Sequence, residues 1–419
     1  MLPTFPGHTF RSTALHCLLV LSAHPAVLAQ ATTVWQVGPE RDLKSPSAAA
    51  GVAGHGDTIE IDAGRYANDY AVWHQDDLTI RGVGGLAHLH SSGLIPNGKG
   101  IWITNGDNTL IENIEFSGAS VRSTNGAGIR HQGGDLTLRN TFFHDNEFSV
   151  LSGRNTDAHI EVRDSRFWFQ RRETRFSHGI YIGTAKRFTL MGSHFKGTDR
   201  GHQVKSRALA NHILYNRIED VAGGNSSRLI DLPNCGRSFI IGNDLHQTAT
   251  ADNFNAIGYG MEGCEDRKPA QRRLVVVNNT FINEAPVTTF VSNRADGPAL
   301  VVNNHLLGNG TWLRGPGETR GNVREGLSGR SPGSWQPAPD SAAVNAATET
   351  AAQLTPDRQF NPPAGTAPRP RSGPLDAGSR EWVGKRAEKG NGGIIFYSLR
   401  PSQPSSRLKG GSESRIARP

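Results

Sequence analysis

Long apolar runs, cysteine and methionine are scarce in this chain of 419 residues, which has 3 cysteines and 3 methionines. Its main apolar stretch, ALHCLLVLSAHPAVLA near the N-terminus, is too short and too interrupted to span a bilayer, so we expect no transmembrane segment. Nothing in the spacing of cysteine and histidine resembles a zinc or haem site. Hydrophobic residues make up only 36% of the chain, helical periodicity is weak, and there are 49 glycines. This composition favours an all-β protein with many turns.

The N-terminus has the features of a secretory signal peptide. Arg11 precedes the apolar stretch, which ends in the small-residue sequence Val27-Leu28-Ala29. We therefore predict a signal peptide over residues 1–29, cleaved near Ala29, and a secreted or periplasmic protein.

Export would leave two cysteines in the mature chain, Cys235 and Cys264, because Cys17 lies in the predicted signal peptide. These two are 29 positions apart, which suits neighbouring turns of a repeat. In an oxidising compartment they could form a disulfide, and two unpaired thiols remain the alternative.

The formal net charge is +7, which favours anionic partners. For an exported monomer, which is what we expect, an acidic polysaccharide is a more suitable partner than nucleic acid. A scattered, solvated surface could give the same net charge, and the arginine-rich residues beyond Gly315 raise it.

A short pattern recurs from Asp57 onward: alternating apolar residues, then Asn, Asp or Gly, then a large apolar residue. Examples are DNTLIENIEFSG, DLTLRNTFFHD, NHILYNRIED and RLVVVNNTFIN. When the large apolar residues are aligned, the gaps between successive copies are 26, 25, 28, 23, 27, 36 and 25 residues. A period of this size predicts a stack of similar coils. The aligned residues are Phe116, Phe142, Phe167, Phe195, Ile218, Leu245, Phe281 and Leu306.

Each copy holds short strands separated by Gly, Asn and Asp, which tolerate a left-handed backbone. Strands this short cannot bury a face alone, but coils stacked about 4.8 Å apart form parallel sheets around a continuous apolar interior. The Asn before the large apolar residue would then stack on its counterpart in the next coil. We therefore predict an all-β solenoid, a right-handed parallel β-helix.

The opening VGP…SPSAAAGVAGHGDTIEIDAGRY and the coils after it resemble the pectate-lyase-like superfamily of exported parallel β-helix proteins, over roughly residues 34–315. The resemblance implies a capping helix in SPSAAAGVA and a first coil in GDTIEIDAGRY. It implies no single activity, because the superfamily includes lyases, hydrolases, epimerases and non-catalytic adhesins. We place the β-helix domain at residues 30–315 and a low-complexity, largely irregular tail at 316–419, in which SGPLDAG could dock on the last coil.

Outward side chains one period apart should form columns. HGIYIG and HQVKSR align at a shift of 24 residues, and VKS aligns with IDL at a further 26. This alignment places Tyr181, Lys205 and Asp231 side by side and pointing outward, because strand alternation turns their neighbours inward. It extends the column upward to Arg130 and downward to Gly258. We predict that the substrate is bound by Tyr181, His178, His202, Arg207, Tyr259 and Glu262.

Cleavage of a uronate polysaccharide by β-elimination needs a base, a cation beside the carboxylate, and an acid for the leaving oxygen. KSRALANHILYN and, one coil later, SSRLIDLPN are similar to the pattern of a β-helix family of alginate and dermatan sulfate lyases. That resemblance implies Lys205 as the base and Arg228 as the acid. Asp231 is the third candidate catalytic residue because it lies beside Lys205 in the column.

Calcium could be the cofactor of such a lyase, since it could neutralise the substrate carboxylate. Its candidate ligands are Asp199, Glu219 and Asp220.

Two other functions remain open. Asp231 and Glu262 lie about one coil apart and could be the paired carboxylates of a glycoside hydrolase. Alternatively, the chain could be a non-catalytic carbohydrate-binding or surface protein, in which Lys205 and Asp231 form only an ion pair between coils. Our prediction is an exported protein that binds an acidic polysaccharide and, in the lyase hypothesis, cleaves it.

Overall fold

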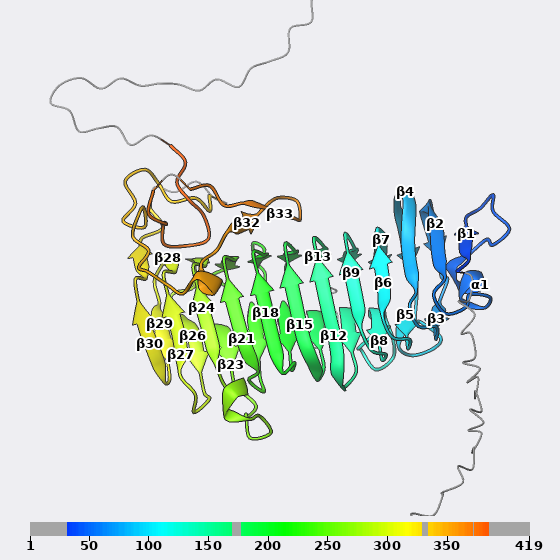
Figure 1. Ribbon diagram of the computed structural model, residues 1–419, viewed down its shortest axis with the longest axis horizontal. Helices are drawn as coiled ribbons and strands as arrows, with labels where there is room; N and C mark the ends of the chain where they lie inside the picture. Colours follow the sequence, from blue (N-terminus) through cyan, green and yellow to red (C-terminus); the bar gives the residue numbers. More distant parts are fainter. Residues whose placement is uncertain (1–31, 170–176, 329–333, 372, 385–419) are drawn as a thin grey trace, which may run out of the picture. The chain divides into compact units, whose positions relative to one another are not determined.

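The computed structural model describes residues 32–169, 177–328, 334–371 and 373–384, so the predicted signal peptide and residues 385–419 lie outside the described residues. The described residues up to Trp382 belong to one compact unit. Its strands wind into coils that stack along two parallel sheets (Figure 1), which confirms the predicted parallel β-helix. No helix within the described ranges has the length and apolar character needed to cross a membrane.

Sheet B, as we call the smaller sheet, has 10 strands and takes one strand from each coil. Its strands are β3 (Ala71–Trp73), β5 (Gly100–Thr104), β8 (Ala127–His131), β11 (Phe148–Ser152), β14 (His178–Ile182), β17 (Val204–Ser206), β20 (Ile230–Leu232), β23 (Asn255–Tyr259), β26 (Thr289–Asn293) and β29 (Thr311–Arg314).

Sheet A has 21 strands, which run in two columns bridged by the long strands β2 and β4. The first column comprises β1 (Val34–Val37), β2 (Thr58–Ala67), β4 (Thr79–His90), β6 (Thr109–Glu112), β9 (Leu136–Arg139), β12 (Asn155–Arg163), β15 (Ala185–Met191), β18 (Ala210–Leu214), β21 (Arg237–Ile241), β24 (Leu274–Val277), β27 (Ala299–Val302) and β30 (Gly317–Arg320). The second comprises β7 (Ile114–Ser117), β10 (Phe142–His144), β13 (Arg166–Trp168), β16 (His194–Lys196), β19 (Arg217–Glu219), β22 (Asp244–Gln247), β25 (Thr280–Asn283), β28 (His305–Gly308) and β31 (Val323–Glu325).

The predicted capping helix is α1 (Pro46–Ala50), which packs against β1 and β3. Ser45 is its N-cap and accepts a hydrogen bond from the backbone N–H of Ala48, while Pro46 occupies the first turn. The first complete coil follows at β2, as the sequence GDTIEIDAGRY indicates.

The interior contains a row of large apolar side chains, one from each coil. Phe116, Phe143, Phe167 and Phe195 stack face to face, with ring centroids 4.3 to 5.2 Å apart. The predicted alignment was wrong at one position, because Phe143 and not Phe142 pairs with Phe116 and Phe167. Two adjacent phenylalanines fit the pattern equally well in sequence, but strand alternation buries Phe143 and leaves Phe142 partly exposed.

A buried asparagine ladder closes the corner between the two columns of sheet A. Each asparagine donates from Nδ2 to the Oδ1 atom of the next, at 2.8 to 3.0 Å. This confirms the predicted stacking, and it satisfies amide groups that would each cost about 1–3 kcal/mol if buried without partners. The ladder comprises Asn216, Asn243, Asn279, Asn304 and Asn322. The residue before the ladder position has a positive φ in successive coils, as the predicted turns require, and examples are Asn113, Asn140, Gly192, Tyr215, Asn278 and Asn303.

The solenoid continues past the predicted boundary at residue 315, because β30 and β31 pair with β27 and β28. Beyond Glu325, the regular elements of the described residues are one 3₁₀ helix, η2 (Ala352–Leu354), and two antiparallel strands, β32 (Arg358–Phe360) and β33 (Thr366–Pro368). A further 3₁₀ helix, η1 (Pro269–Gln271), lies earlier, between β23 and β24. This segment docks on the corner residues of sheet A, where Asn278 Nδ2 donates to the carbonyls of Asp376 and Gly378. The described part of the SGPLDAG sequence, residues 373–378, therefore docks on coils before the last one.

Candidate functional site

The predicted column lies on sheet B with the predicted register. Tyr181 on β14 pairs with Lys205 on β17, Lys205 pairs with Asp231 on β20, and Asp231 pairs with Gly258 on β23. Their neighbours on each strand, including Val204 and Ser206, are fully buried in the interior, as strand alternation predicts. A shift of one residue in β17 or β20 would turn the charged side chain of Lys205 or Asp231 into the apolar core.

Arg130 is farther away than predicted. Leu151 on β11 lies between Arg130 on β8 and Tyr181 on β14, so an additional coil separates the two polar residues. The sequence alignment missed this coil because its strand FSVLS carries no charged residue at the column position.

The column points away from the core, but other side chains cover it. Asp231 is only 1% exposed and Lys205 only 9% exposed, whereas the carboxylate-bearing side chain of Glu262 is 46% exposed. The side chains of Arg228 and Glu262 contact Asp231 and Lys205 from outside the sheet. A substrate would therefore meet Glu262 and the arginines before it met Asp231.

These residues form a continuous ion network, which we call the Lys205 cluster: Tyr181, Lys205, Arg207, Arg228, Asp231 and Glu262. Lys205 Nζ lies 3.0 Å from Glu262 Oε1 and 3.7 Å from Asp231 Oδ2, and 5.4 Å from the centre of the Tyr181 ring. Arg228 Nη1 donates to Asp231 Oδ1 at 3.2 Å. Burial raises the pKa of Asp231, and the charges of Arg228 and Lys205 only partly offset this.

Arg207 connects the more exposed residues of the cluster through its hydrogen bonds. Its Nη2 donates to Glu262 Oε2 at 2.7 Å, its Nε donates to the Tyr181 hydroxyl at 2.7 Å, and its Nη1 donates to Asn234 Oδ1. Burial alone would raise the pKa of Glu262, but hydrogen bonds from Arg207 and Lys205 outweigh it and lower that pKa. Asn234 was not predicted; it directly precedes Cys235, and only the turn geometry brings it to Arg207.

The two predicted histidines, His178 and His202, lie beside the cluster and accept hydrogen bonds from backbone N–H groups. The imidazoles of His178 and His202 stack with centroids 5.1 Å apart. His178 Nδ1 accepts the N–H of His202 at 2.8 Å, and His202 Nδ1 accepts the N–H of Arg228 at 3.1 Å. Burial, assisted by the charge of Lys205, lowers the pKa of His178 to about 3, and burial also lowers the pKa of His202.

We expect these histidines to make the fold sensitive to acid. In the unfolded chain a histidine takes up its proton near pH 6.5, but in the folded protein His178 does so only near pH 3. Between these values the unfolded state binds more protons, so stability should fall as the pH falls from about 6.5 toward 3. The thermal midpoint of a His178→Asn variant, whose Oδ1 can replace Nδ1 as acceptor, should fall less steeply over this range. A His159→Gln variant, which changes a half-exposed side chain, is the control, and an unchanged slope in His178→Asn would contradict this account.

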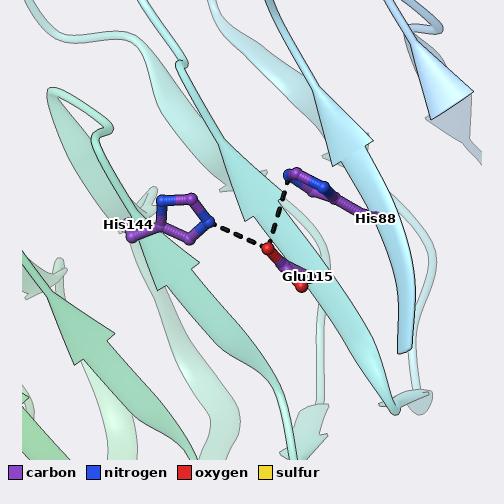
Figure 2. Close-up of side chains that lie close together, drawn as sticks. All are labelled: His88, Glu115 and His144. Carbon is purple, nitrogen blue, oxygen red and sulfur yellow. Dashed lines mark hydrogen bonds and ion pairs between the residues drawn. The ribbon is translucent and has the colours of Figure 1, made fainter. Parts of the chain in front are cut away.

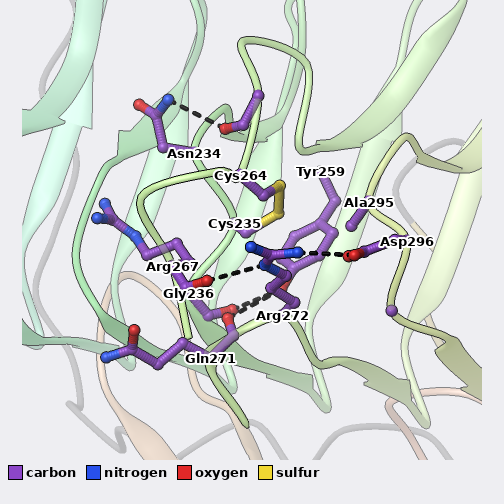
Figure 3. Close-up of a disulfide and its surroundings, with 12 residues drawn as sticks. Asn234, Cys235, Gly236, Tyr259, Cys264, Arg267, Gln271, Arg272, Ala295 and Asp296 are labelled. Carbon is purple, nitrogen blue, oxygen red and sulfur yellow. Dashed lines mark hydrogen bonds and ion pairs between the residues drawn. A yellow bond between two sulfur atoms is a disulfide. The ribbon is translucent and has the colours of Figure 1, made fainter. Parts of the chain in front are cut away.

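Tyr259 does not reach the substrate side, and its predicted role in binding is wrong. Its side chain is fully buried, and its hydroxyl donates to the carbonyl of Gly236 at 2.7 Å (Figure 3). Tyr259 neighbours the column residue Gly258 on β23, so strand alternation turns it into the core.

A disulfide joins Cys235 and Cys264 beside the cluster (Figure 3). It links the turn after β20 to the turn after β23, and the second turn carries Glu262. The N–H of Glu262 also donates to the carbonyl of Pro233 at 2.9 Å. The turn is therefore fixed at two points, which positions the Glu262 carboxylate over Lys205 and Arg207.

A cavity of about 780 Å³ lies beside η1 and is lined by residues that include Arg237, Arg272 and Arg273. It contains no member of the Lys205 cluster. Arg272 already donates to Asp296 at 2.6 Å, so we base the candidate site on the Lys205 cluster.

No protein-family model matches the chain, and no curated protein matches its sequence. Among solved structures, the crystal structure of pectate lyase Pel9A is similar, with a TM-score of 0.52, 12% sequence identity, and coverage of 84% of this chain and 97% of that chain. The chain has a pectate-lyase-like parallel β-helix fold. At this sequence identity the similarity shows the fold alone, so the role of each residue depends on the geometry described above.

The residues expected to bind calcium are not gathered into a site. Glu219 Oε1 lies 2.8 Å from His194 Nε2, and the Asp220 carboxylate accepts hydrogen bonds from Ser226 and Thr248. Asp199 is on a different turn, and the described residues place these three in no common group of potential metal ligands. We therefore assign no step of a reaction to calcium.

Proposed function

We propose that this protein binds an acidic polysaccharide at the Lys205 cluster and cleaves it by β-elimination. The observation that carries the proposal is the position of the Glu262 carboxylate, which bridges Lys205 Nζ and Arg207 Nη2 at 3.0 and 2.7 Å. A uronate carboxylate has the same charge and shape, so it could take the place of Glu262 and accept a charge-assisted hydrogen bond from Arg207 Nη2, the guanidinium nitrogen that is not bonded to Tyr181 or Asn234. The turn is fixed, but the Glu262 side chain is half-exposed, so its carboxylate can rotate into solvent while the backbone stays in place.

In this proposal Lys205 acts as the base once Glu262 has moved away. Lys205 first gives up its ammonium proton to solvent, and its neutral Nζ then takes the proton from the carbon next to the uronate carboxylate. The freed electron pair forms a carbon–carbon double bond, and the glycosidic C–O bond breaks with its electrons passing to the leaving oxygen, which takes up a proton as it departs. Arg207 and Arg228 stabilise the negative charge that develops on the carboxylate. The sequence resemblance assigns Arg228 as the acid, and its guanidinium lies in the right cluster, although here it is bonded to Asp231.

Tyr181 would contribute a surface on which a sugar ring can rest. Its ring is partly exposed, and its hydroxyl is held by Arg207. Pectate lyase Pel9A, whose solved structure is similar to that of this chain, adds support for an acidic polysaccharide as substrate.

The direct test is incubation of the full chain with alginate, pectate and glycosaminoglycans. A lyase should produce a rise in ultraviolet absorbance from the unsaturated sugar, with one new double bond for each new reducing end. If no polymer gives this absorbance, the lyase proposal is wrong; if binding persists and no new reducing ends form either, the non-catalytic alternative holds.

A glycoside hydrolase is the second candidate, and the paired carboxylates favour it. The pKa of Asp231 is raised by burial while the pKa of Glu262 is lowered by its hydrogen bonds from Arg207 and Lys205, and such divergence is typical of an acid and base pair. Against it, Asp231 is almost completely covered. New reducing ends without the absorbance of a double bond would identify a hydrolase in the same experiment.

A further inference from the structure

A second polar cluster lies on sheet A, whereas the Lys205 column lies on sheet B. His88 on β4, Glu115 on β7 and His144 on β10 come from three successive coils, and both imidazoles point toward the Glu115 carboxylate (Figure 2). His88 pairs directly with Glu115 in the sheet, and His144 lies two residues farther along, opposite Ser117. No sequence motif indicates this group, because its members are 27 and 29 residues apart and only the coil stacking brings them together.

The geometry of the three ligand atoms is close to that of a metal site. Glu115 Oε1 lies 2.9 Å from His144 Nε2 and 3.5 Å from His88 Nε2, and all three potential ligand atoms lie within 4.8 Å of one another. Zinc–ligand bonds of about 2.0–2.1 Å in a tetrahedral arrangement place ligand atoms about 3.3 Å apart. Small rotations of the side chains would therefore suffice to bring the three atoms around one ion.

The surrounding residues orient these ligands. His144 Nδ1, the nitrogen that faces away from Glu115, lies 2.6 Å from Asp145 Oδ2. A carboxylate on the second nitrogen is the arrangement that orients metal-binding histidines and raises their basicity. The Ser117 hydroxyl lies 2.7 Å from His88 Nε2 and 2.8 Å from His90 Nδ1, so it holds His88 beside Glu115 and gives up its contact with Nε2 when that nitrogen binds the ion.

We propose that His88, Glu115 and His144 bind a zinc ion. Two imidazole nitrogens and one carboxylate oxygen form a donor set used by catalytic zinc sites, which keep the fourth position for water or substrate. The three side chains are 19 to 24% exposed, so solvent or an anionic oxygen can reach that position. Calcium and magnesium suit this set poorly, because they prefer oxygen ligands.

The proposal can be tested by zinc titration of the full chain, prepared without a histidine tag and stripped of metal with a chelator. Calorimetry should show one saturable site. His88→Ala and His144→Ala should each weaken zinc binding by at least about tenfold, and Asp145→Asn, which removes only the orienting charge, should weaken it by about tenfold. Cobalt should give the intense visible absorbance of a tetrahedral site in the wild-type chain and lose it in His144→Ala.

The matched control is His246→Ala. His246 also lies on sheet A and pairs with a glutamate, Glu284, at 3.1 Å, but the described residues supply no second histidine ligand there. Zinc affinity in this variant should equal that of the wild type. Equal zinc affinity in the wild type, His88→Ala and His144→Ala would overturn the proposal, as would the absence of binding or a site that takes only calcium. If an alanine variant fails to fold, His88→Gln and His144→Gln provide the same comparison. Because the readout is metal binding, these outcomes are independent of whether the Lys205 cluster is catalytic.

Discussion

Replacing Lys205 by alanine should lower the rate of polysaccharide cleavage by about 10² to 10⁴-fold, the usual contribution of a general base. The fold should survive the change, because the inward neighbours Val204 and Ser206 keep their packing. The two carboxylates also keep a cationic partner, since Asp231 remains bonded to Arg228 and Glu262 remains bonded to Arg207. The measurements are the steady-state rate on the best substrate and the thermal midpoint of the variant.

Two further variants separate catalysis from charge. Lys205→Arg keeps a cation beside Asp231 but replaces the amine with a guanidinium that stays protonated, so it should bind substrate and remain inactive. Lys186→Ala removes an exposed lysine on β15 and should change neither rate nor midpoint. If Lys205→Ala unfolds the chain, or if Lys205→Arg keeps full activity, then Lys205 is a structural cation and not the base.

The fold could be predicted from the sequence because each coil repeats a pattern with a strict physical cause. A buried asparagine, a left-handed corner and a large inward side chain all recur at the coil period, and the structure confirms the ladder from Asn216 to Asn322. The alignment of Phe142 in place of Phe143 shows what the repeat pattern cannot predict. Hydrophobicity cannot distinguish adjacent phenylalanines, and only the pairing with neighbouring strands decides which one is buried.

The candidate site could be predicted only where it follows the column. The pairing of Tyr181, Lys205 and Asp231 depends on strand register, which the period supplies. Their burial depends on the turn that carries Glu262 and on the conformation of Arg228, and neither leaves a periodic signal. For the same reason the sequence does not predict that His88, Glu115 and His144 lie close together, because each of them is an ordinary residue within its own coil.

The segment after Glu325 has no repeat pattern, yet it makes specific contacts with the solenoid. Its composition predicted irregular structure, and regular elements there are indeed short. Composition says nothing about docking, however, and this segment buries an ion pair between Arg369 and Glu381 at 2.6 Å. It also places Ser379 and Arg380 against Asp244 in the solenoid.

Asp244→Ala should therefore destabilise the protein more than a substitution of any surface residue. The Asp244 side chain is fully buried, and it accepts hydrogen bonds from Arg217 at 2.8 Å, Arg380 at 2.7 Å and the Ser379 hydroxyl at 2.6 Å. Burial opposes its ionisation, but the two arginines outweigh burial and lower the pKa of Asp244. Removing one partner of a buried ion pair costs about 3–5 kcal/mol, because the remaining charges lose their compensation.

The loss should show a specific spatial pattern. Arg380 belongs to the docked segment and Arg217 to the solenoid, so Asp244→Ala should release the segment before the coils unfold. Limited proteolysis should then cut between Glu325 and Arg380 in the variant at temperatures where the wild type resists, and the thermal midpoint should fall. Asp296→Ala is the control, because the Asp296 side chain is 69% exposed beside Arg272 and such a pair contributes under about 1 kcal/mol. Equal effects of the two substitutions would mean that Arg217 and Arg380 regain hydration without Asp244, and that packing of the segment rather than this ion network holds it on sheet A.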